Sequence, residues 1–391
     1  MNPRHSATIR CSALLLCLLL GCVAREAGAQ TVRAATEVGA YQDTTATSVL
    51  TPTIRAAIDH PTAGWNMSGQ YLVDVVTAAS PDIVSTASPK WTEVRHAGNL
   101  GFAYKPSTLG ANVGASVSST PDYLSVSGSA GGSVELDDKH MTLSALYAYG
   151  HDVVGRTGTS FDTFSRTLDS HAFIAGISRI VNASLVISGY ADVILERGDG
   201  SKPYRYVPMF ARDVAGSIAP GASFEEVANR RLSVKPLEQL PLARGRYAVT
   251  VRLAQRSGVG TFRLEERAYR DSWNMWASTS DLKFLFDVSS RLVLWPHARF
   301  HIQTPVNFWQ RAYGITNVAH VPEVRTGDRE LGPLTTLGGG AGIRFRAGSD
   351  GNPDGLVFAF TADAYWTHFS DALFLTDRVS GLGVFSCEVE L

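Results

Sequence analysis

Cysteine, long apolar runs and an excess of either charge are all scarce in this chain of 391 residues. Cys387 is the only cysteine after residue 29, so a chain processed at that point cannot form an internal disulfide. No stretch beyond residue 29 is apolar over the roughly 20 residues that a transmembrane helix requires. The 35 basic and 36 acidic residues nearly balance, which argues against nucleic acid as a partner. Strand pairing and burial, rather than covalent cross-links, must therefore hold the fold together.

The N-terminus has the layout of an export signal. Arg4 and Arg10 precede an apolar stretch that is too short to span a bilayer, and Ala27-Gly28-Ala29 forms a small-x-small cleavage site. We therefore expect a signal peptide at 1–29 and a single domain at 30–391. Removing the three arginines and one glutamate of the signal leaves 32 basic and 35 acidic residues.

A second processing route involves Cys22. The segment Leu19-Leu20-Gly21-Cys22 resembles a bacterial lipoprotein box, in which Cys22 would carry a lipid. Cleavage after Ala29 fits the pattern of small residues better. Both routes predict export from a bacterial cytoplasm.

From residue 31 onward, apolar residues alternate with polar or small ones. In Tyr247-Ala248-Val249-Thr250-Val251-Arg252-Leu253 every second residue is bulky and apolar. Successive side chains of a strand point to opposite faces, so this pattern predicts a sheet with one apolar and one polar face. About sixteen such segments can be recognised, at 31–43, 46–60, 63–78, 91–105, 108–119, 123–135, 139–151, 167–180, 183–196, 242–256, 259–272, 275–289, 291–304, 334–348, 355–368 and 376–391.

The connections between these segments alternate in length. If the first strand runs outward, the even-numbered connections are periplasmic, and nearly all of them are short, as at Asp137-Asp138. The long connections all fall on the other side, at 79–90, 152–166, 197–241 and 305–333. Outer-membrane barrels have short inside turns and long outside loops. The sequence thus predicts an all-β fold, a transmembrane antiparallel up-and-down barrel in the bacterial outer membrane with periplasmic termini.

Charged residues share one face of the strands predicted between 259 and 304. A basic residue facing lipid at mid-bilayer costs about 2–4 kcal/mol, so we expect this face to line the lumen. The lumen-lining candidates are Arg263, Glu265, Arg267, Asp281, Lys283, His297, Arg299 and His301. Their mixed signs favour ion pairs across neighbouring strands. A role in selecting solutes is the alternative, because charge rings do so in pores.

The same residues do not predict a metal or a paired-carboxylate site. His297 and His301 lie about 13 Å apart on an extended strand, at ~3.3 Å per residue, and cannot chelate one ion together. Glu265 and the adjacent Glu266 point to opposite faces, and Glu266 is expected near a membrane boundary. No metal and no cofactor are therefore expected.

Two further segments have local patterns of their own. Gly338-Gly339-Gly340-Ala341-Gly342 is not followed by a helix, so we expect a kink or close packing against an interior loop rather than phosphate binding. In the loop 197–241, residues 224–231 could form two helical turns with Ser223 or Ala222 near the cap. This loop is expected either to fold into the lumen or to cover its outer mouth.

Several segments, in order along the chain, resemble an uncharacterised family of bacterial outer-membrane proteins, a domain of unknown function. They are Asp74-Val75-Val76-Thr77-Ala78-Ala79-Ser80-Pro81, Thr92-Glu93-Val94-Arg95-His96, Pro121-Asp122-Tyr123, Pro203-Tyr204-Arg205-Tyr206-Val207-Pro208 and Tyr269-Arg270-Asp271-Ser272-Trp273. The resemblance implies a β-barrel and supplies no catalytic residues. The alternating end, Phe385 to Leu391, resembles the signal that the barrel-assembly machinery recognises.

Three classes of function remain open on the sequence. The first is a non-enzymatic outer-membrane barrel that passes or binds a solute or has a structural role, with membrane lipid and the assembly machinery as partners. The second is a barrel-embedded hydrolase, for which the histidine-bearing strand at 291–304 is the only candidate region, because no G-x-S-x-G, H-E-x-x-H or P-loop motif occurs. The third is a secreted soluble β-protein, whose strands are usually shorter than these.

Overall fold

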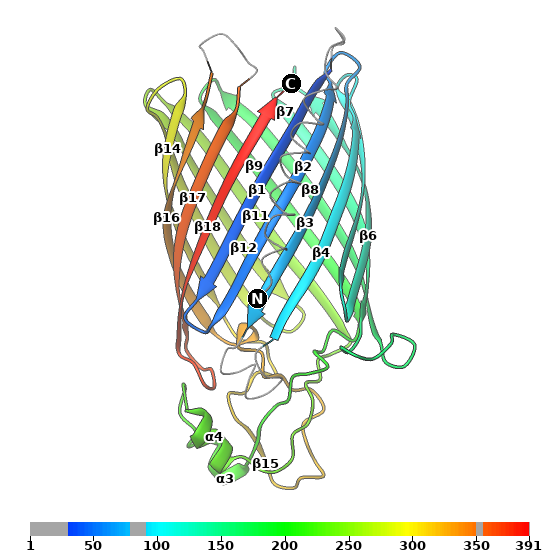
Figure 1. Cartoon of the computed structure of the whole chain (residues 1–391), viewed down its shortest axis with the longest axis vertical. Helices are drawn as coiled ribbons and strands as arrows, with labels where there is room; N and C mark the ends of the chain where they lie inside the picture. The colour runs from blue at the N-terminus through cyan, green and yellow to red at the C-terminus, as the bar shows by residue number, and fades with distance from the viewer. Residues whose placement is uncertain (1–29, 79–90, 349–354, 391) are drawn as a thin grey trace, which may run out of the picture.

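The computed structural model of the chain is a closed antiparallel barrel of sixteen strands (Figure 1). The structure describes residues 30–78, 91–348 and 355–390, so the predicted signal peptide and Cys22 lie outside the described residues. The strands of the barrel are β1 (Thr31–Asp43), β2 (Thr47–His60), β3 (Trp65–Ala78), β4 (Trp91–Tyr104), β5 (Leu109–Thr120), β6 (Tyr123–Leu136), β7 (Met141–Val154), β8 (Arg166–Asn182), β9 (Leu185–Gly198), β11 (Ala243–Ser257), β12 (Gly260–Asp271), β13 (Trp276–Asp287), β14 (Leu292–Gln303), β16 (Leu334–Arg346), β17 (Val357–Phe369) and β18 (Asp377–Glu390). The predicted fold class and strand number are confirmed, and every strand bound falls within three residues of the prediction.

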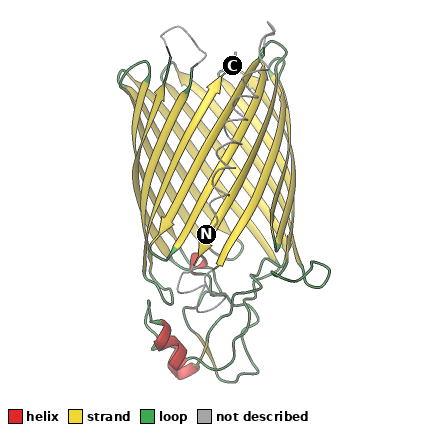
Figure 2. Ribbon diagram, viewed as in Figure 1, coloured by secondary structure: helices red, strands yellow, loops and turns green. Residues whose placement is uncertain are grey.

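Each strand of the barrel pairs with its neighbours along the chain, and β1 closes the sheet against β18. The closing register sets Arg33 opposite Glu390 and Asp43 opposite Ser380. Figure 2 shows the strands tilted relative to the long axis, as closure of a sheet requires. Closure leaves no unpaired edge, which is the arrangement that outer-membrane proteins have.

The two rims of the barrel differ in the length of their connections. At one rim, here called the turn rim, short turns join the strands, and Thr31 and Glu390 lie there too. The other rim, the loop rim, carries the long connections at 155–165, 199–242 and 304–333 (Figure 1). The predicted segregation of loop lengths is therefore confirmed for the described residues, while 79–90 lies outside them. That the turn rim faces the periplasm stays a prediction.

The two faces of the wall follow the predicted alternation. On β13, Trp276, Leu282 and Phe286 have exposed side chains on one parity, whereas Asp281 and Lys283 occupy the other. Paired residues on adjacent strands point to the same face of the sheet, so apolar residues lie on the same side of every strand. The outer face of the barrel is therefore apolar and its inner face is polar.

Glu266 is an exception on the apolar outer face. It lies midway along β12, opposite Val251 and Ser280, and not near a membrane boundary as expected. Ser278 Oγ donates a hydrogen bond to Glu266 Oε1 at 2.7 Å, and the Ser280 hydroxyl donates to the second carboxylate oxygen. The two serine hydroxyls give this carboxylate hydrogen-bond donors on a face that otherwise offers almost none.

Beyond the loop rim, the connections at 199–242 and 304–333 fold together into a small body that we call the cap (Figure 1). It contains the parallel pair β10 (Met209–Ala211) and β15 (Tyr313–Ile315), the helices α3 (Arg212–Ala215) and α4 (Phe224–Arg230), and the 3-10 helix η1 (Arg329–Leu331). Ser223, one of the two predicted cap positions, caps α4 by accepting a hydrogen bond from the backbone N–H of Glu226. The long loop had two predicted positions, inside the lumen or over its mouth. In the structure it lies over the mouth.

The cap holds the tightly packed core of the described chain. Val207, Met209, Tyr313 and Ile315 form one buried cluster across β10 and β15, and Phe210, Ile218, Ala222 and Val227 form a second one next to α4. The largest fully buried side chains lie in the cap or at strand ends beside it. Among the described residues, no helix is long and apolar enough to cross a membrane.

Candidate functional site in the lumen and its cap

The eight predicted lumen residues lie together on the inner face of three adjacent strands, β12, β13 and β14. Register sets Arg263 opposite Lys283, and Glu265 opposite Asp281. On the other side of β13, Asp281 opposes Arg299, and Lys283 opposes His297. The remaining two candidates, Arg267 and His301, both flank Thr279 in this register. The structure thus brings the predicted residues into one patch.

Asp281 is the centre of this patch. His297 Nε2 lies 2.8 Å from Asp281 Oδ2, and Arg299 Nη1 lies 3.4 Å from the same oxygen. Lys283 Nζ lies 3.9 Å from Asp281 Oδ1. Three basic side chains therefore share the charge of one carboxylate.

His297 also reaches across a whole strand. Its Nδ1 lies 2.7 Å from Asp363 Oδ1 of β17, although β16 runs between β14 and β17. Gly340 occupies the intervening position, opposite both His297 and Asp363, and a Cβ there would lie 2.1 Å from Asp363 Oδ1. The absence of a side chain at Gly340 is what allows this contact.

The glycine run of β16 is explained by its neighbours on the inner face. A Cβ at Gly338 would lie 2.4 Å from the ring of Tyr365, and a Cβ at Gly342 would lie 2.1 Å from the ring of Trp295. The close packing expected here is therefore present, but the partners are side chains of adjacent strands and not an interior loop. Trp295 fills this part of the lumen wall.

Ion pairs also connect the patch to charged residues of β11 and β9 that were not among the eight predicted lumen residues. Arg252 Nε of β11 lies 2.5 Å from Glu265 Oε2, and Arg267 Nη1 lies 2.6 Å from Asp192 Oδ2 of β9. The even-numbered residues of the Tyr247–Leu253 segment contain Arg252 on this face, so the same alternation could have identified it.

His301 has different surroundings from His297. Its Nδ1 lies 2.7 Å from Thr279 Oγ1, and its Nε2 lies 3.3 Å from Gln303 Oε1. Within the described part of the chain, no group of three or more His, Cys, Asp or Glu side chains could hold a metal ion.

The inner face of β11–β14 and β16, here called the arginine wall, is rich in basic residues. The alternation places ten Lys or Arg residues on it: Arg244, Arg246, Arg252, Arg256, Arg263, Arg267, Lys283, Arg299, Arg344 and Arg346. Four acidic residues share this face: Glu265, Asp271, Asp281 and Asp287. The inner face of β5–β8, here called the serine wall, carries mainly Ser, Gly, Ala and Thr. The inner face therefore carries many more charged side chains on the arginine wall than on the serine wall.

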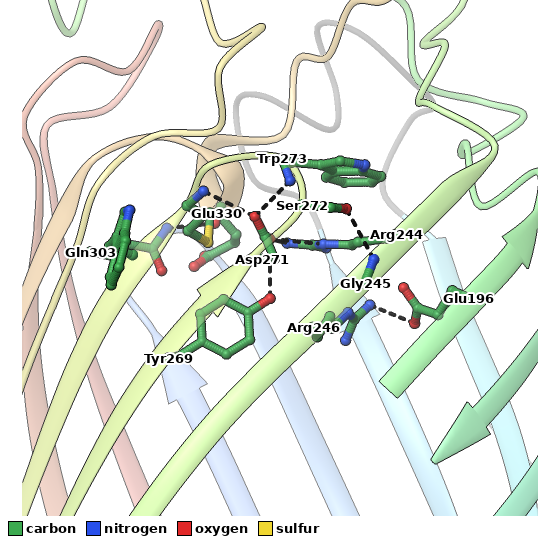
Figure 3. Close-up of polar contacts among 12 residues, drawn as sticks. Glu196, Arg244, Gly245, Arg246, Tyr269, Asp271, Ser272, Trp273, Gln303 and Glu330 are labelled. Carbon is green, nitrogen blue, oxygen red and sulfur yellow. Dashed lines mark hydrogen bonds and ion pairs between the residues drawn. The ribbon is translucent and has the colours of Figure 1, made fainter. Parts of the chain in front are cut away.

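At the loop rim, Asp271 anchors the turn between β12 and β13 (Figure 3). Its Oδ1 accepts hydrogen bonds from the backbone N–H groups of Trp273 at 3.0 Å and Met275 at 2.9 Å. Its Oδ2 accepts from Tyr269 Oη at 3.1 Å and Arg244 Nε at 2.9 Å. The Asp271 side chain is fully buried by these contacts.

The turn between β1 and β2 repeats this arrangement. Asp43 Oδ1 accepts from the backbone N–H groups of Thr45 and Thr47, and Tyr41 Oη donates to Asp43 Oδ2 at 2.9 Å. In both turns the third residue after the aspartate, Ala46 or Asn274, has a positive φ. The shared Tyr-x-Asp sequence is a signal that could have identified both turns.

A charge network around the buried Glu238 connects the two halves of the cap. Arg205 Nη1 lies 2.6 Å from Asp328 Oδ2 and 3.2 Å from Glu238 Oε1, and Thr326 Oγ1 donates to Glu238 Oε1 at 2.6 Å. Burial alone would raise the pKa of Asp328, but the Arg205 guanidinium holds it below the ordinary value. Burial raises the pKa of the nearby Tyr313 phenol to about 12.

The cap extends across the mouth of the barrel. Tyr204 Oη donates to Asp122 Oδ2 in the β5–β6 turn at 2.7 Å, and the backbone N–H of Gly221 donates to Ala372 O in the β17–β18 connection at 3.0 Å. Arg311 also forms an ion pair with Asp371. On the shorter way round the barrel, the β17–β18 connection and the β5–β6 turn are separated by six strands, namely β18, β1, β2, β3, β4 and β5. The cap therefore bridges much of the loop-rim opening.

A recess of about 370 Å³ lies in the arginine wall. Its lining on the inner face includes Ser188, Arg252, Arg263, Glu265, Asp281 and Lys283. Four of the eight predicted lumen residues thus meet at one hollow. Arg252 and Ser188 are the polar lining residues that sequence reasoning missed.

Comparison with known proteins finds similar solved structures and a matching sequence family. A search of curated proteins finds no match to this sequence. The chain is similar to a bacterial polysaccharide outer membrane secretin, with 8% identity, a TM-score of 0.47, and coverage of 94% of this chain and 100% of that one. It is also similar to Pseudomonas aeruginosa OccK2 (OpdF), solved in complex with glucuronate, with 9% identity, a TM-score of 0.44 and coverage of 93% and 98%. A third similar structure is that of Pseudomonas aeruginosa OprD, with 6% identity, a TM-score of 0.44, and coverage of 93% of this chain and 95% of that one.

These likenesses are too distant to identify what this chain carries or binds. The match to a sequence family is more extensive, since it covers residues 27–368 and so includes most of the barrel and the whole cap. It confirms the resemblance seen in the ordered segments from Asp74 to Trp273. The chain belongs to the DUF3570 family, which is described as a protein of unknown function.

Proposed function

We propose that this chain is an outer-membrane pore through which small polar solutes cross, with no catalytic role. The observation that carries the proposal is the contrast between the two faces of one closed sheet. The outer face exposes large apolar side chains such as Phe286 and Phe300, whereas the inner face carries ion pairs and exposed arginines. The apolar outer face is compatible with lipid hydrocarbon chains, and the charged inner face is compatible with water.

The interior supports a water-filled path rather than a packed core. Sixteen strands enclose more space than side chains fill. The largest fully buried side chains of the described chain lie in or beside the cap and not within the wall. A soluble sandwich would instead bury its apolar faces against each other.

The surroundings of His301 do not favour a hydrolase. A hydrolytic triad needs a histidine that is oriented by a carboxylate and that contacts a nucleophile. His301 contacts Thr279 and Gln303, while the histidine that contacts carboxylates, His297, is held between Asp281 and Asp363. Both histidines therefore fit a structural role in the wall.

Conductance in planar lipid bilayers tests the proposal. The mature chain should give discrete current steps, and a variant in which a short Gly-Ser linker replaces residues 203–236 should give larger steps, because the cap bridges the mouth. A shift in gel mobility on boiling would show that each protein is folded. Folded protein that gives no current with and without the cap segment would contradict the proposal.

A further inference from the structure

The recess in the arginine wall contains cations that its own carboxylates do not neutralise. Arg252 is paired with Glu265 at 2.5 Å. Asp281 is the second carboxylate there, and it is shared among Lys283, His297 and Arg299. Each acidic group in the recess is therefore already engaged by at least one basic side chain.

Arg263 has no acidic partner among the described residues. Its side chain is exposed to the lumen and lines the recess, and no ion pair within 4.0 Å joins it to a carboxylate of that part of the chain. A guanidinium presents five N–H donors in a planar fork. Those donors are available to a molecule in the lumen.

The position of Arg263 makes an anionic occupant favourable. Arg263 lies directly opposite Lys283, and like charges that face each other across two strands destabilise the pair. Lys283 is only loosely held, since its Nζ lies 3.9 Å from Asp281. An oxyanion between the two side chains would remove this repulsion and accept hydrogen bonds from both.

We propose that this recess binds the oxyanion group of a permeating solute, a carboxylate or a phosphate, and makes the pore anion-selective. The inference rests on the proposed function and names the solute class of that pore. Arg263 would hold the anion by paired N–H···O bonds, Lys283 would supply a point charge, and Ser188 lies on the same lining.

Two further basic residues of the arginine wall lie outside the recess, near the turn rim. Arg344 and Arg346 lie at the turn-rim end of β16, exposed on the inner face, and no ion pair joins them to a described carboxylate. A lining of one sign raises the local concentration of the opposite ion. These two arginines therefore attract anions without belonging to the recess, and they provide a matched control.

Two variants separate the recess from the general charge of the wall. Arg263→Gln with Lys283→Gln removes two cations from the recess, and Arg344→Gln with Arg346→Gln removes two cations outside it. In planar bilayers under a KCl gradient, we expect both variants to lower the permeability ratio of chloride to potassium by about threefold.

Block of the chloride current is the measurement that tests the recess itself. Inorganic phosphate and succinate are added separately, so that phosphate and carboxylate binding are distinguished. We expect the half-blocking concentration of at least one of them to rise about tenfold in the Arg263/Lys283 variant, because two charge-assisted contacts are lost. The Arg344/Arg346 variant should leave that concentration unchanged. Equal half-blocking concentrations in wild type and the Arg263/Lys283 variant would overturn the proposal.

Failure of the proposed pore function can be distinguished from failure of the proposed anion site. If no protein gave any current, the proposed function would be wrong, and phosphate and succinate would be titrated calorimetrically into detergent-solubilised protein. Heat of binding that disappears only in the Arg263/Lys283 variant would support the recess, and heat that is absent or equal in all proteins would overturn it. Boiling-dependent gel mobility shows throughout that each variant is folded.

Discussion

The arginine wall and the serine wall are built from strands with the same outer face but different inner faces. Both expose bulky apolar residues outward, as Val113 and Phe173 do on one wall and Leu282 and Phe300 on the other. On the inside, the serine wall has small hydroxyl contacts such as Ser116 Oγ to Ser127 Oγ at 2.7 Å. The arginine wall instead has ion pairs that reach two strands away, as from His297 to Asp363.

The difference shows that membrane embedding constrains only one side of this sheet. Lipid fixes the outer chemistry of every strand equally, because each strand crosses the same apolar layer. The inner side is free to vary, so its charge distribution carries information on function that the outer side does not. Three pairs of measurements test whether the two walls differ in packing, in stability and in their attachment to the cap.

Gly340 on the arginine wall is expected to tolerate an alanine far less well than Gly150 on the serine wall. In Gly340→Ala the new Cβ would lie 2.1 Å from Asp363 Oδ1 and 2.3 Å from the backbone oxygen of Ala362, which cannot move away cheaply. We expect a loss of about 2–3 kcal/mol in the free energy of unfolding, measured by urea titration in lipid vesicles.

Gly150→Ala is the matched substitution on the serine wall. Its Cβ would meet Ser170 Oγ at 2.7 Å, and that hydroxyl can rotate to another position. We expect a change of about 0.5 kcal/mol or less. Equal destabilisation by the two alanines would show that the walls do not differ in packing.

Asp281→Asn tests whether the ion-pair network stabilises the arginine wall. The change removes the charge that His297, Arg299 and Lys283 share, and it leaves these groups partly buried with fewer acidic partners. We expect a loss of about 1–2 kcal/mol, discounted because Lys283 and Arg299 remain in contact with water.

Ser127→Ala is the corresponding loss on the serine wall, where one neutral hydrogen bond to Ser116 disappears. About 0.5 kcal/mol is expected, because water can replace the lost partner. A larger loss for Ser127→Ala than for Asp281→Asn would reverse the comparison.

The smallest effect concerns the attachment of the cap to the serine wall. Burial alone would raise the pKa of Asp122, but hydrogen bonds donated by the hydroxyls of Tyr204, Thr157 and Thr120 hold it below the ordinary value of 3.8. A carboxyl with a lowered pKa stabilises the folded state above its unfolded pKa, and this contribution is lost as the pH falls through the folded-state value. Acidification to below about pH 3.8 should therefore loosen this attachment.

Limited proteolysis of the loop at 155–165 with an acid-active protease measures this loosening. Cleavage should rise as the pH falls in wild type, and Asp122→Asn should show raised cleavage at every pH, with an effect of about 1 kcal/mol or less. A wild-type profile that does not depend on pH, or an Asp122→Asn variant that follows wild type, would contradict the assignment.

Much of the barrel could be predicted from the sequence because its signals are local. The period of two in segments such as Tyr247–Leu253 identifies the strands and their faces, and the lengths of the connections identify the rims. The same reasoning placed Arg263 and Asp281 on one face. It missed Asp363 and Asp192 as ion-pair partners, because those contacts depend on strands distant in the chain.

The cap shows the limit of local reasoning most clearly. Prolines such as Pro203 and Pro236 argue against regular structure, and the sequence correctly suggested only the short helix after Ser223. The order of the cap comes from pairing Met209 with Tyr313, which are more than a hundred residues apart, and from the Arg205–Asp328 contact. No pattern within either loop could reveal these contacts.

The order of residues alone is enough to derive sixteen amphipathic strands, long connections on one side and a shared polar face. Alternation is a property of neighbouring residues, and any closed sheet of these strands must present its apolar side outward to lipid. The pairs of charges that meet, the glycines that make room for them, and the joining of two remote loops above the opening become apparent only in the folded barrel. Those outcomes depend on register and closure, which bring together atoms that the order of residues leaves far apart.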